Sequence, residues 1–223
     1  MSFNIAIDGP AGAGKSTIAK RVAEKLSFLY VDTGAMYRAI ALYLIQNGID
    51  GADEEGVRNA CSQIHVGIEY QDGSQQVLLD GENVTHRIRT EEVGNMASVS
   101  AANPDVRAAL LNLQRDLAAK ENVLMDGRDI GTNVLPNAQL KVYLTASVST
   151  RARRRFLELQ EKGTECSLEE IEQDIKERDR RDMTREIAPL KRAEDAVLVD
   201  SSDMTIEEVV ERICELYEEV KRS

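Results

Sequence analysis

Residues 9–16 read Gly-Pro-Ala-Gly-Ala-Gly-Lys-Ser and fit the spacing G-x-x-x-x-G-K-S/T. In this pattern the glycines let the backbone wrap closely around a phosphate group and point successive N–H groups at it. The N-terminus of the following helix adds partial positive charge. Lys15 then reaches the β- and γ-phosphates, and the Ser16 hydroxyl can ligate Mg²⁺. The sequence therefore predicts a nucleoside triphosphate site made of Gly9, Pro10, Ala11, Gly12, Ala13, Gly14, Lys15, Ser16 and Thr17.

Arginines and hydroxyls gather at three further places in the chain. Thr33 and Arg38 lie in the segment Asp-Thr-Gly-Ala-Met-Tyr-Arg, which follows a short apolar run. Arg128 and Asp129 follow another apolar run, in Asp-Gly-Arg-Asp-Ile-Gly. Such residues suit the binding of an anion beyond the end of a strand, because guanidinium groups bind phosphate in a bidentate manner.

The third cluster belongs to two predicted helices. Arg178, Asp182 and Arg185 have i, i+4 and i+7 spacing, so they share one helical face. Four arginines occur within residues 151–155, and three of them, Arg151, Arg154 and Arg155, share a face as well. The alternative interpretation of the 178–185 segment is a solvated helix crossed by salt bridges.

Five short apolar runs alternate with helical patterns and predict the elements that must position these residues. The runs are residues 3–7, 28–31, 123–125, 140–144 and 196–199. Continuous apolar strands separated by helices indicate a parallel sheet covered on both faces. Ligands of such sheets bind beyond the carboxyl ends of the strands. We therefore predict an α/β fold, a phosphate-loop five-stranded parallel sheet flanked by helices.

One stretch departs from this rhythm. Apolar residues alternate over residues 66–70 and 77–79, and Asp-Gly turns follow each run, which predicts a small antiparallel meander. We expect residues 47–99 to form an insert that binds a monophosphate. Residues 1–46 and 100–223 form the core, with a helical lid over about residues 147–165.

Composition narrows the classes of partner. The chain has 223 residues and a net charge of −11, from 28 basic and 39 acidic side chains. Such a balance disfavours nucleic-acid polymers and anionic membranes. No apolar stretch approaches 18 residues, so no membrane partner is expected. Three scattered cysteines fit the reducing cytoplasm, where we expect the protein to be a monomer.

The motifs together resemble those of bacterial cytidylate kinases, which transfer a phosphoryl group from ATP to CMP or dCMP. The resemblance runs through nearly the whole chain in order. It is carried by residues 9–17, 32–38, 103–107, 126–132, 151–155 and 177–190. The segments Asp-Thr-Gly-Ala-Met-Tyr-Arg and Asp-Gly-Arg-Asp-Ile-Gly-Thr are far more specific than the phosphate loop.

The resemblance implies roles for individual residues. Ser98, Arg107 and Asp129 would read the cytosine edge, and Arg178 and Asp182 would hold the ribose. Arg38, Arg128 and Arg185 would bind the monophosphate, with Thr33 close by. Catalysis would rest on Lys15, Arg128, Arg185 and Asp129, with Mg²⁺ held by Ser16. Arg151, Arg154 and Arg155 would contact ATP.

Two other functions stay open at this point. The chain has neither the guanine-reading N-K-x-D sequence of regulatory GTPases nor an L-S-G-G-Q-like ABC signature. A phosphate-loop kinase for another nucleoside monophosphate or a small metabolite is the main alternative. A nucleotide-dependent binding protein without phosphotransfer is the other, although such a protein has no need for a second set of cations.

Overall fold

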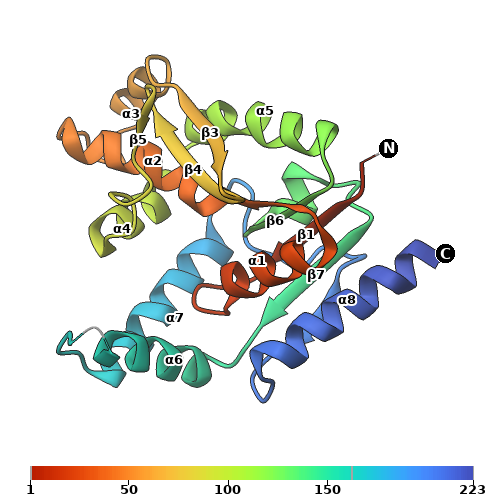
Figure 1. The fold of residues 1–223 in the computed structure, drawn as a ribbon. Coiled ribbons are helices and arrows are strands. Elements are labelled where there is room, and N and C mark those ends of the chain that lie inside the picture. Colours follow the sequence, from red (N-terminus) through yellow and green to blue (C-terminus); the bar gives the residue numbers. More distant parts are fainter. Residues whose placement is uncertain (1, 162, 223) are drawn as a thin grey trace.

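The computed structural model describes residues 2–161 and 163–222 and contains the predicted parallel sheet (Figure 1). The sheet has the order β2-β6-β1-β7-β8, and every neighbouring pair is parallel. Its strands are β1 (Asn4–Asp8), β2 (Leu29–Asp32), β6 (Val123–Gly127), β7 (Leu140–Thr145) and β8 (Val197–Asp200). All five predicted strands are confirmed.

Helices cover both faces of the sheet. Helices α1 (Lys15–Leu26) and α8 (Ile206–Arg222) lie on one face, and α2 (Thr33–Gln46) and α5 (Pro104–Lys120) lie on the other. Side chains of a strand alternate between faces, so Ile5 and Ile7 join the core under α1 and α8, whereas Ala6 packs under α2 and α5. The loops at the carboxyl ends of the strands are thereby fixed on a rigid support.

Local signals set where the outer helices begin. Helix α5 starts at Pro104, and the Asn103 carboxamide oxygen accepts from the Asp105 backbone N–H. Helix α8 starts with a reciprocal capping box in which Thr205 and Glu208 each bond the other's backbone N–H. Proline at the first helical position and a Thr-x-x-Glu capping box are both typical of helix starts.

Residues 47–99 contain the predicted meander with two additional helices. The insert comprises α3 (Glu54–Cys61), the antiparallel strands β3 (Val66–Gln71), β4 (Ser74–Leu79) and β5 (Glu82–Asn83), and α4 (Glu91–Ser100). Both turns are Asp-Gly pairs with positive φ at each residue, 50° and 73° for the first and 51° and 85° for the second. This is the geometry that two-residue hairpins prefer. The short helices α3 and α4 were not foreseen.

The insert is tied to the edge strand β2 by side chains. The Tyr70 hydroxyl donates to the Tyr30 carbonyl at 2.9 Å. Gln75 accepts from the Asp32 backbone N–H at 2.8 Å and donates to the Asp32 carbonyl at 3.1 Å. Because β2 is at the edge of the sheet, its outer backbone groups need such partners. The amide of Gln75 thus replaces a neighbouring strand at the end of β2.

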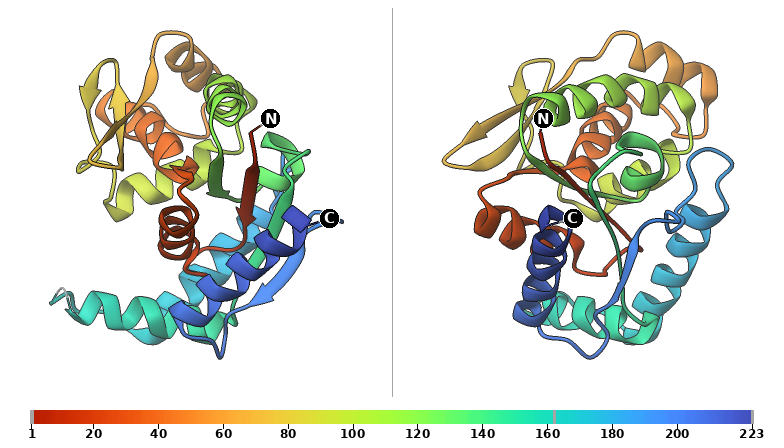
Figure 2. Two further views of the ribbon diagram at one scale, coloured as in Figure 1. Left: turned by 45° about the vertical axis from the view of Figure 1, so that its right-hand side comes forward. Right: turned by 90° about the vertical axis from the view of Figure 1, so that its right-hand side faces the viewer.

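The helices α6 (Val148–Glu161) and α7 (Leu168–Thr184) pack against each other around Ala152, Ile171 and Ile175. The α6–α7 pair and the insert extend from the same side of the sheet. The pair lies at one end of the molecule and the insert at the other (Figure 2). Residues 147–165, which the sequence predicts to act as a lid, comprise α6 and the start of the following connection, with residue 162 outside the described part of the chain. In that described part, no helix has both the length and the apolar character needed to cross a bilayer.

The contact between the insert and β2 generates the first prediction. Replacing Gln75 with Met leaves the N–H and carbonyl of Asp32 without their partners, which costs about 1–3 kcal/mol. Urea denaturation of Gln75→Met measures the loss. Gln76→Met is the matched control, since Gln76 lies on the same strand and, among the described residues, its carboxamide hydrogen-bonds only the Asn83 side chain. Equal stabilities of the two variants would show that the amide does not support the edge of β2.

Candidate functional site

The phosphate loop connects the end of β1 to the start of α1. Gly12 and Gly14 have φ values of 72° and 82°, in the left-handed region that glycine adopts without penalty. A Cβ atom on Gly9 would lie 1.9 Å from the Leu144 carbonyl oxygen, so no larger residue fits there. The Lys15 ammonium is buried and donates to the Pro10 carbonyl at 2.8 Å. Burial, and next the charge of Arg128, lowers the pKa of Lys15 well below its ordinary value.

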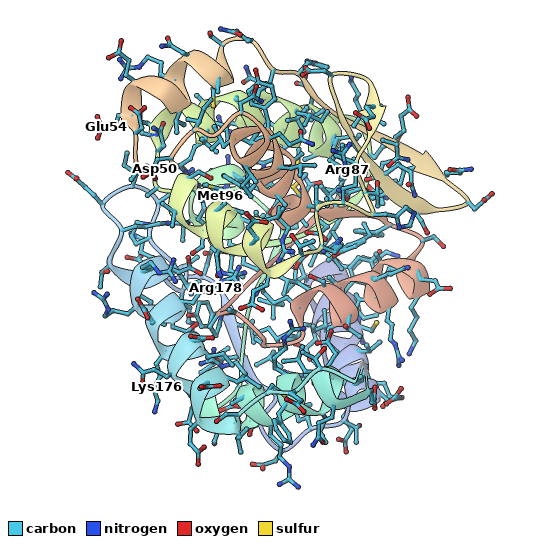
Figure 3. The ribbon with its side chains drawn as sticks, turned by 90° about the vertical axis from the view of Figure 1, so that its left-hand side faces the viewer. Asp50, Glu54, Arg87, Met96, Lys176 and Arg178 are labelled. Carbon is cyan, nitrogen blue, oxygen red and sulfur yellow. The ribbon has the colours of Figure 1, made fainter. Side chains whose placement is uncertain are left out.

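Arg128 and Asp182 bring the end of β6 and helix α7 together. Arg128 Nε donates to Asp182 Oδ2 at 2.8 Å, and both side chains are mostly buried. The pKa of Arg178 is lowered to about 10 by burial and by the positive charge of Arg128, with Arg38 contributing as well. Arg178 lies on the side of α7 that faces α4, whereas Lys176 points outward (Figure 3). Four cations from four separate segments, Lys15 included, therefore influence one another here.

Asp129 is the centre of a second buried group. It accepts from Arg107 Nη2, from Arg185 Nη2 at 3.4 Å and from Asn133 Nδ2 at 3.2 Å. The Arg107 guanidinium also lies 5.7 Å from the centre of the Tyr37 ring. Arg185 follows the last residue of α7 and is held by the Ala188 carbonyl, which accepts from its Nε and Nη2 at 2.8 and 2.6 Å. Arg185 therefore reaches Asp129 from beyond α7 rather than from its face.

The start of α2 and the insert supply the remaining predicted residues. The Thr33 hydroxyl is buried and donates to the Asp126 carbonyl at 2.7 Å. Arg38 donates to the Ile88 carbonyl at 3.1 Å, and its pKa is lowered by burial and by Arg89, with Arg128 and Arg155 contributing. The Ser98 hydroxyl oxygen is buried and has no hydrogen-bond partner among the described residues. Thr33 is thus the first residue of α2 in the core, whereas Ser98 lies on α4 of the insert.

Comparison with known proteins identifies the relatives of this chain. The family description named cytidylate kinase matches residues 5–219. The cytidylate kinase of Caldicellulosiruptor saccharolyticus is 51% identical over 218 residues, which is 98% of this chain and 96% of that protein. The cytidylate kinase of Shouchella clausii is 50% identical over 220 residues, or 99% and 98% of the two chains.

The chain belongs to the cytidylate kinase family. Among solved structures, an uncharacterized protein from Eubacterium ventriosum shares the fold, with a TM-score of 0.55 and 12% identity over 96% of this chain and 98% of that one. The expected family and fold are thus confirmed.

In this cytidylate kinase family member, the three predicted lid arginines have different surroundings. Arg151 is only 3% exposed and donates to the Ala11 carbonyl and to Asp179 Oδ2, at 2.8 and 2.6 Å. Arg154 donates to the Ser201 carbonyl at 2.7 Å. Arg155 is half-exposed and pairs with Glu158 at 2.9 Å. Arg151 therefore connects the phosphate loop to α7 through buried contacts.

The residues beside the phosphate loop fit a magnesium ion. Ser16 Oγ donates to Asp126 Oδ2 at 2.9 Å, and the Tyr30 hydroxyl donates to Asp126 Oδ1 at 2.9 Å. Hydroxyl and carboxylate oxygens are the ligands that Mg²⁺ prefers, together with substrate phosphates and water. Burial and the charge of Asp32 raise the pKa of Asp126. Asp126 was not predicted as a partner of Ser16, although its position at a strand end beside the phosphate loop is a signal for it.

Asp8 is a further residue that the sequence analysis missed, and its titration yields a second prediction. Burial raises the pKa of Asp8 from 3.8 to about 6, against the lowering effect of two backbone N–H groups. The folded state therefore binds this proton more tightly than the unfolded state. The stability that Asp8 contributes below about pH 4 is lost as the pH rises through about 6, and a shift of this size corresponds to about 3 kcal/mol.

Urea denaturation of the wild type and of Asp8→Asn between about pH 4 and pH 7 measures this effect. The free energy of unfolding of the wild type, minus that of the variant, should fall by up to about 3 kcal/mol over this range. The subtraction removes the contributions of other titrating groups, because Asn does not ionise. A difference that stays constant with pH would mean that Asp8 titrates normally.

Proposed function

We propose that this chain transfers the γ-phosphoryl group of ATP to CMP or dCMP, giving ADP and CDP or dCDP. The observation that carries the proposal is the convergence of two sets of cations at one edge of the sheet. Lys15 of the phosphate loop lies close enough to Arg128 and Arg178 for their charges to lower its pKa. A nucleotide donor and an anionic acceptor would meet between these groups.

The proposed chemistry needs no general base. The acceptor phosphate is already anionic at neutral pH, so catalysis consists of positioning the two nucleotides and neutralising the transferring group. Lys15, Arg128 and Arg185 would supply that positive charge. Asp129 would orient Arg107 and Arg185, which it already contacts. A magnesium ion held through Ser16 and Asp126 would add charge neutralisation at the ATP phosphates.

Recognition of the acceptor would use the remaining buried groups. The hydroxyl of Ser98 and the carboxylate of Asp129 can accept from the N4 amino group of cytosine, and Arg107 can donate to its O2 and N3 acceptors. Uracil reverses the donor pattern, so a site built in this way disfavours it. Arg178 and Asp182 would bind the ribose, and Arg38, Arg128 and Thr33 would lie around the monophosphate. Arg155, with Arg151 and Arg154, would complete the ATP side.

An acceptor panel tests the proposal. We expect ADP release coupled to rapid turnover with CMP and dCMP, and much slower turnover with UMP, AMP or GMP. Rapid turnover of AMP but not CMP would favour a kinase for another monophosphate. Slow ATP hydrolysis that no monophosphate accelerates would favour a nucleotide-binding protein. A cytoplasmic monomer remains a prediction of the sequence.

A prediction about Asp182 separates the acceptor from the donor. Replacing Asp182 with Ala removes a carboxylate that would accept from the ribose and that holds Arg128. Loss of a hydrogen bond to a charged group costs about 1.5–3 kcal/mol, so the KM for CMP should rise about 10- to 100-fold. The KM for ATP should change less than about twofold. Steady-state kinetics with each nucleotide varied in turn measures both constants.

Asp174→Ala is the matched control, because Asp174 is an exposed carboxylate on the same helix. It should leave both KM values unchanged. Equal increases in the two KM values of Asp182→Ala would argue that α7 is only a salt-bridged support.

A further inference from the structure

The end of β1 carries a buried carboxylate that reaches across to the segment following Arg128. Asp8 is 5% exposed, and its two oxygens accept from the backbone N–H groups of Ile130 and Gly131, each at 2.7 Å. These are short hydrogen bonds of the charge-assisted kind. Ile130 and Gly131 open the single π-helical turn η1 (Ile130–Val134), so the carboxylate fixes the first two residues of this turn.

The other end of η1 is fixed by a second charged side chain. Arg115 of α5 donates from Nε to the Val134 carbonyl at 3.1 Å and from Nη2 to the Asn133 carbonyl at 3.0 Å. The five-residue turn is thus held at its N-terminal end by the Asp8 carboxylate and at its C-terminal end by the Arg115 guanidinium.

The turn is attached directly to groups of the proposed active site. Asp129 immediately precedes it, and Arg128 is one residue further away. On the other side, Asp8 immediately precedes Gly9 of the phosphate loop. The contact between Asp8 and η1 therefore links the loop that would hold ATP to the arginine that would neutralise the transferring group, beside the hydrogen bond between Ser16 and Asp126.

A role in stability alone does not account for this carboxylate. In its ionised form Asp8 is buried, and among the described residues its only hydrogen-bond donors are the two backbone N–H groups. The charge of Lys15 acts on it favourably and that of Asp129 unfavourably. Burial disfavours the ionised carboxylate of Asp8. The protein is therefore less stable with Asp8 ionised, at neutral pH, than it would be with Asp8 protonated. What the ionised form provides is two acceptors at fixed positions.

We propose that Asp8 is a positioning residue for phosphoryl transfer, which sets the placement of Arg128 and Asp129 relative to the phosphate loop by holding the start of η1. Arg115 holds the other end of the same turn. Asp8 touches neither nucleotide in this arrangement. Its effect is on the geometry of the transition state, where a displacement of about 1 Å can cost about 100-fold in rate.

The test is the kinetics of Asp8→Asn at neutral pH. Asparagine has the same shape but only one acceptor oxygen, so its NH₂ group faces one of the two backbone N–H groups. We expect kcat for CMP to fall about 10-fold or more, with the KM values for ATP and CMP within about twofold of the wild type. Asp53→Asn is the control, since Asp53 accepts from the backbone N–H of Gly56 at the start of α3, in the insert.

A purely structural role would change the melting temperature of Asp8→Asn and leave kcat unaltered below it. A kcat within twofold of the wild type would therefore overturn the proposal. An increase in both KM values at unchanged kcat would overturn it as well, because it would assign Asp8 to binding.

A second variant keeps the proposal testable if Asp8→Asn does not fold. Arg115 is largely exposed, so Arg115→Gln is expected to fold, and it releases the carbonyl end of η1. It should show the same pattern to a smaller extent, with kcat about threefold or more lower and both KM values unchanged. Arg58→Gln is its control, because Arg58 is an exposed arginine that pairs with Asp105 between α3 and α5. Equal kcat values for the two variants would overturn the proposal.

The inference rests on the proposed function, and the acceptor panel separates the two. If the wild type does not phosphorylate CMP, the proposed function fails. If the wild type turns over CMP normally and both positioning variants match it, only the role of Asp8 and η1 fails.

Discussion

Repulsion among cations gathered at the carboxyl edge of the sheet is the constraint on which the rest of this structure depends. Lys15, Arg38, Arg128 and Arg178 come from four separate segments, and the charge of Arg128 lowers the pKa of each of the other three. Carboxylates are set among them to compensate. Asp182 pairs with Arg128, and it also acts favourably on Lys15 and Arg178. The arrangement keeps positive charge concentrated while the buried Asp182 compensates for part of the repulsion.

This constraint explains how an acidic protein can bind polyanions. The net charge of −11 is a property of the whole chain, whereas the carboxyl edge of the sheet gathers Lys15, Arg38, Arg128 and Arg178. The backbone must come close there. A Cβ atom on Gly127 would lie 2.6 Å from Ile130 Cδ1 and 2.9 Å from Thr33 Oγ1, so glycine allows η1 and the start of α2 to meet at the end of β6. The close approach of these backbone segments thus lets the cations that they carry gather at one edge of the sheet.

The sequence predicted the elements well and the contacts between them only in part. Apolar runs and the phosphate-loop spacing depend on local residues, so the five strands, the Asp-Gly hairpins and the start of α1 followed from pattern alone. The partners of charged residues do not follow from local pattern. Ser16 and Asp126 are 110 positions apart, and Asp8 and Ile130 are 122 apart. Their pairing depends on β1 lying beside β6, which no local pattern states. The helical spacing of Arg178, Asp182 and Arg185 also implied a shared face, whereas α7 ends at Thr184 and Arg185 reaches Asp129 from the loop beyond it.

The arginines of α6 show how burial divides one charged segment into two parts. Arg151 lies between the Ala11 carbonyl and Asp179, and both members of this ion pair are buried. Breaking a buried pair costs about 3–5 kcal/mol, so these contacts hold the first turn of α6 against the phosphate loop. Arg155 lies one turn further along, half-exposed, and its charge acts on Arg38 from the other side of the site. The Arg151–Asp179 pair also ties α7 to the first turn of α6, whereas Arg155, which pairs with Glu158, lies outside these buried contacts.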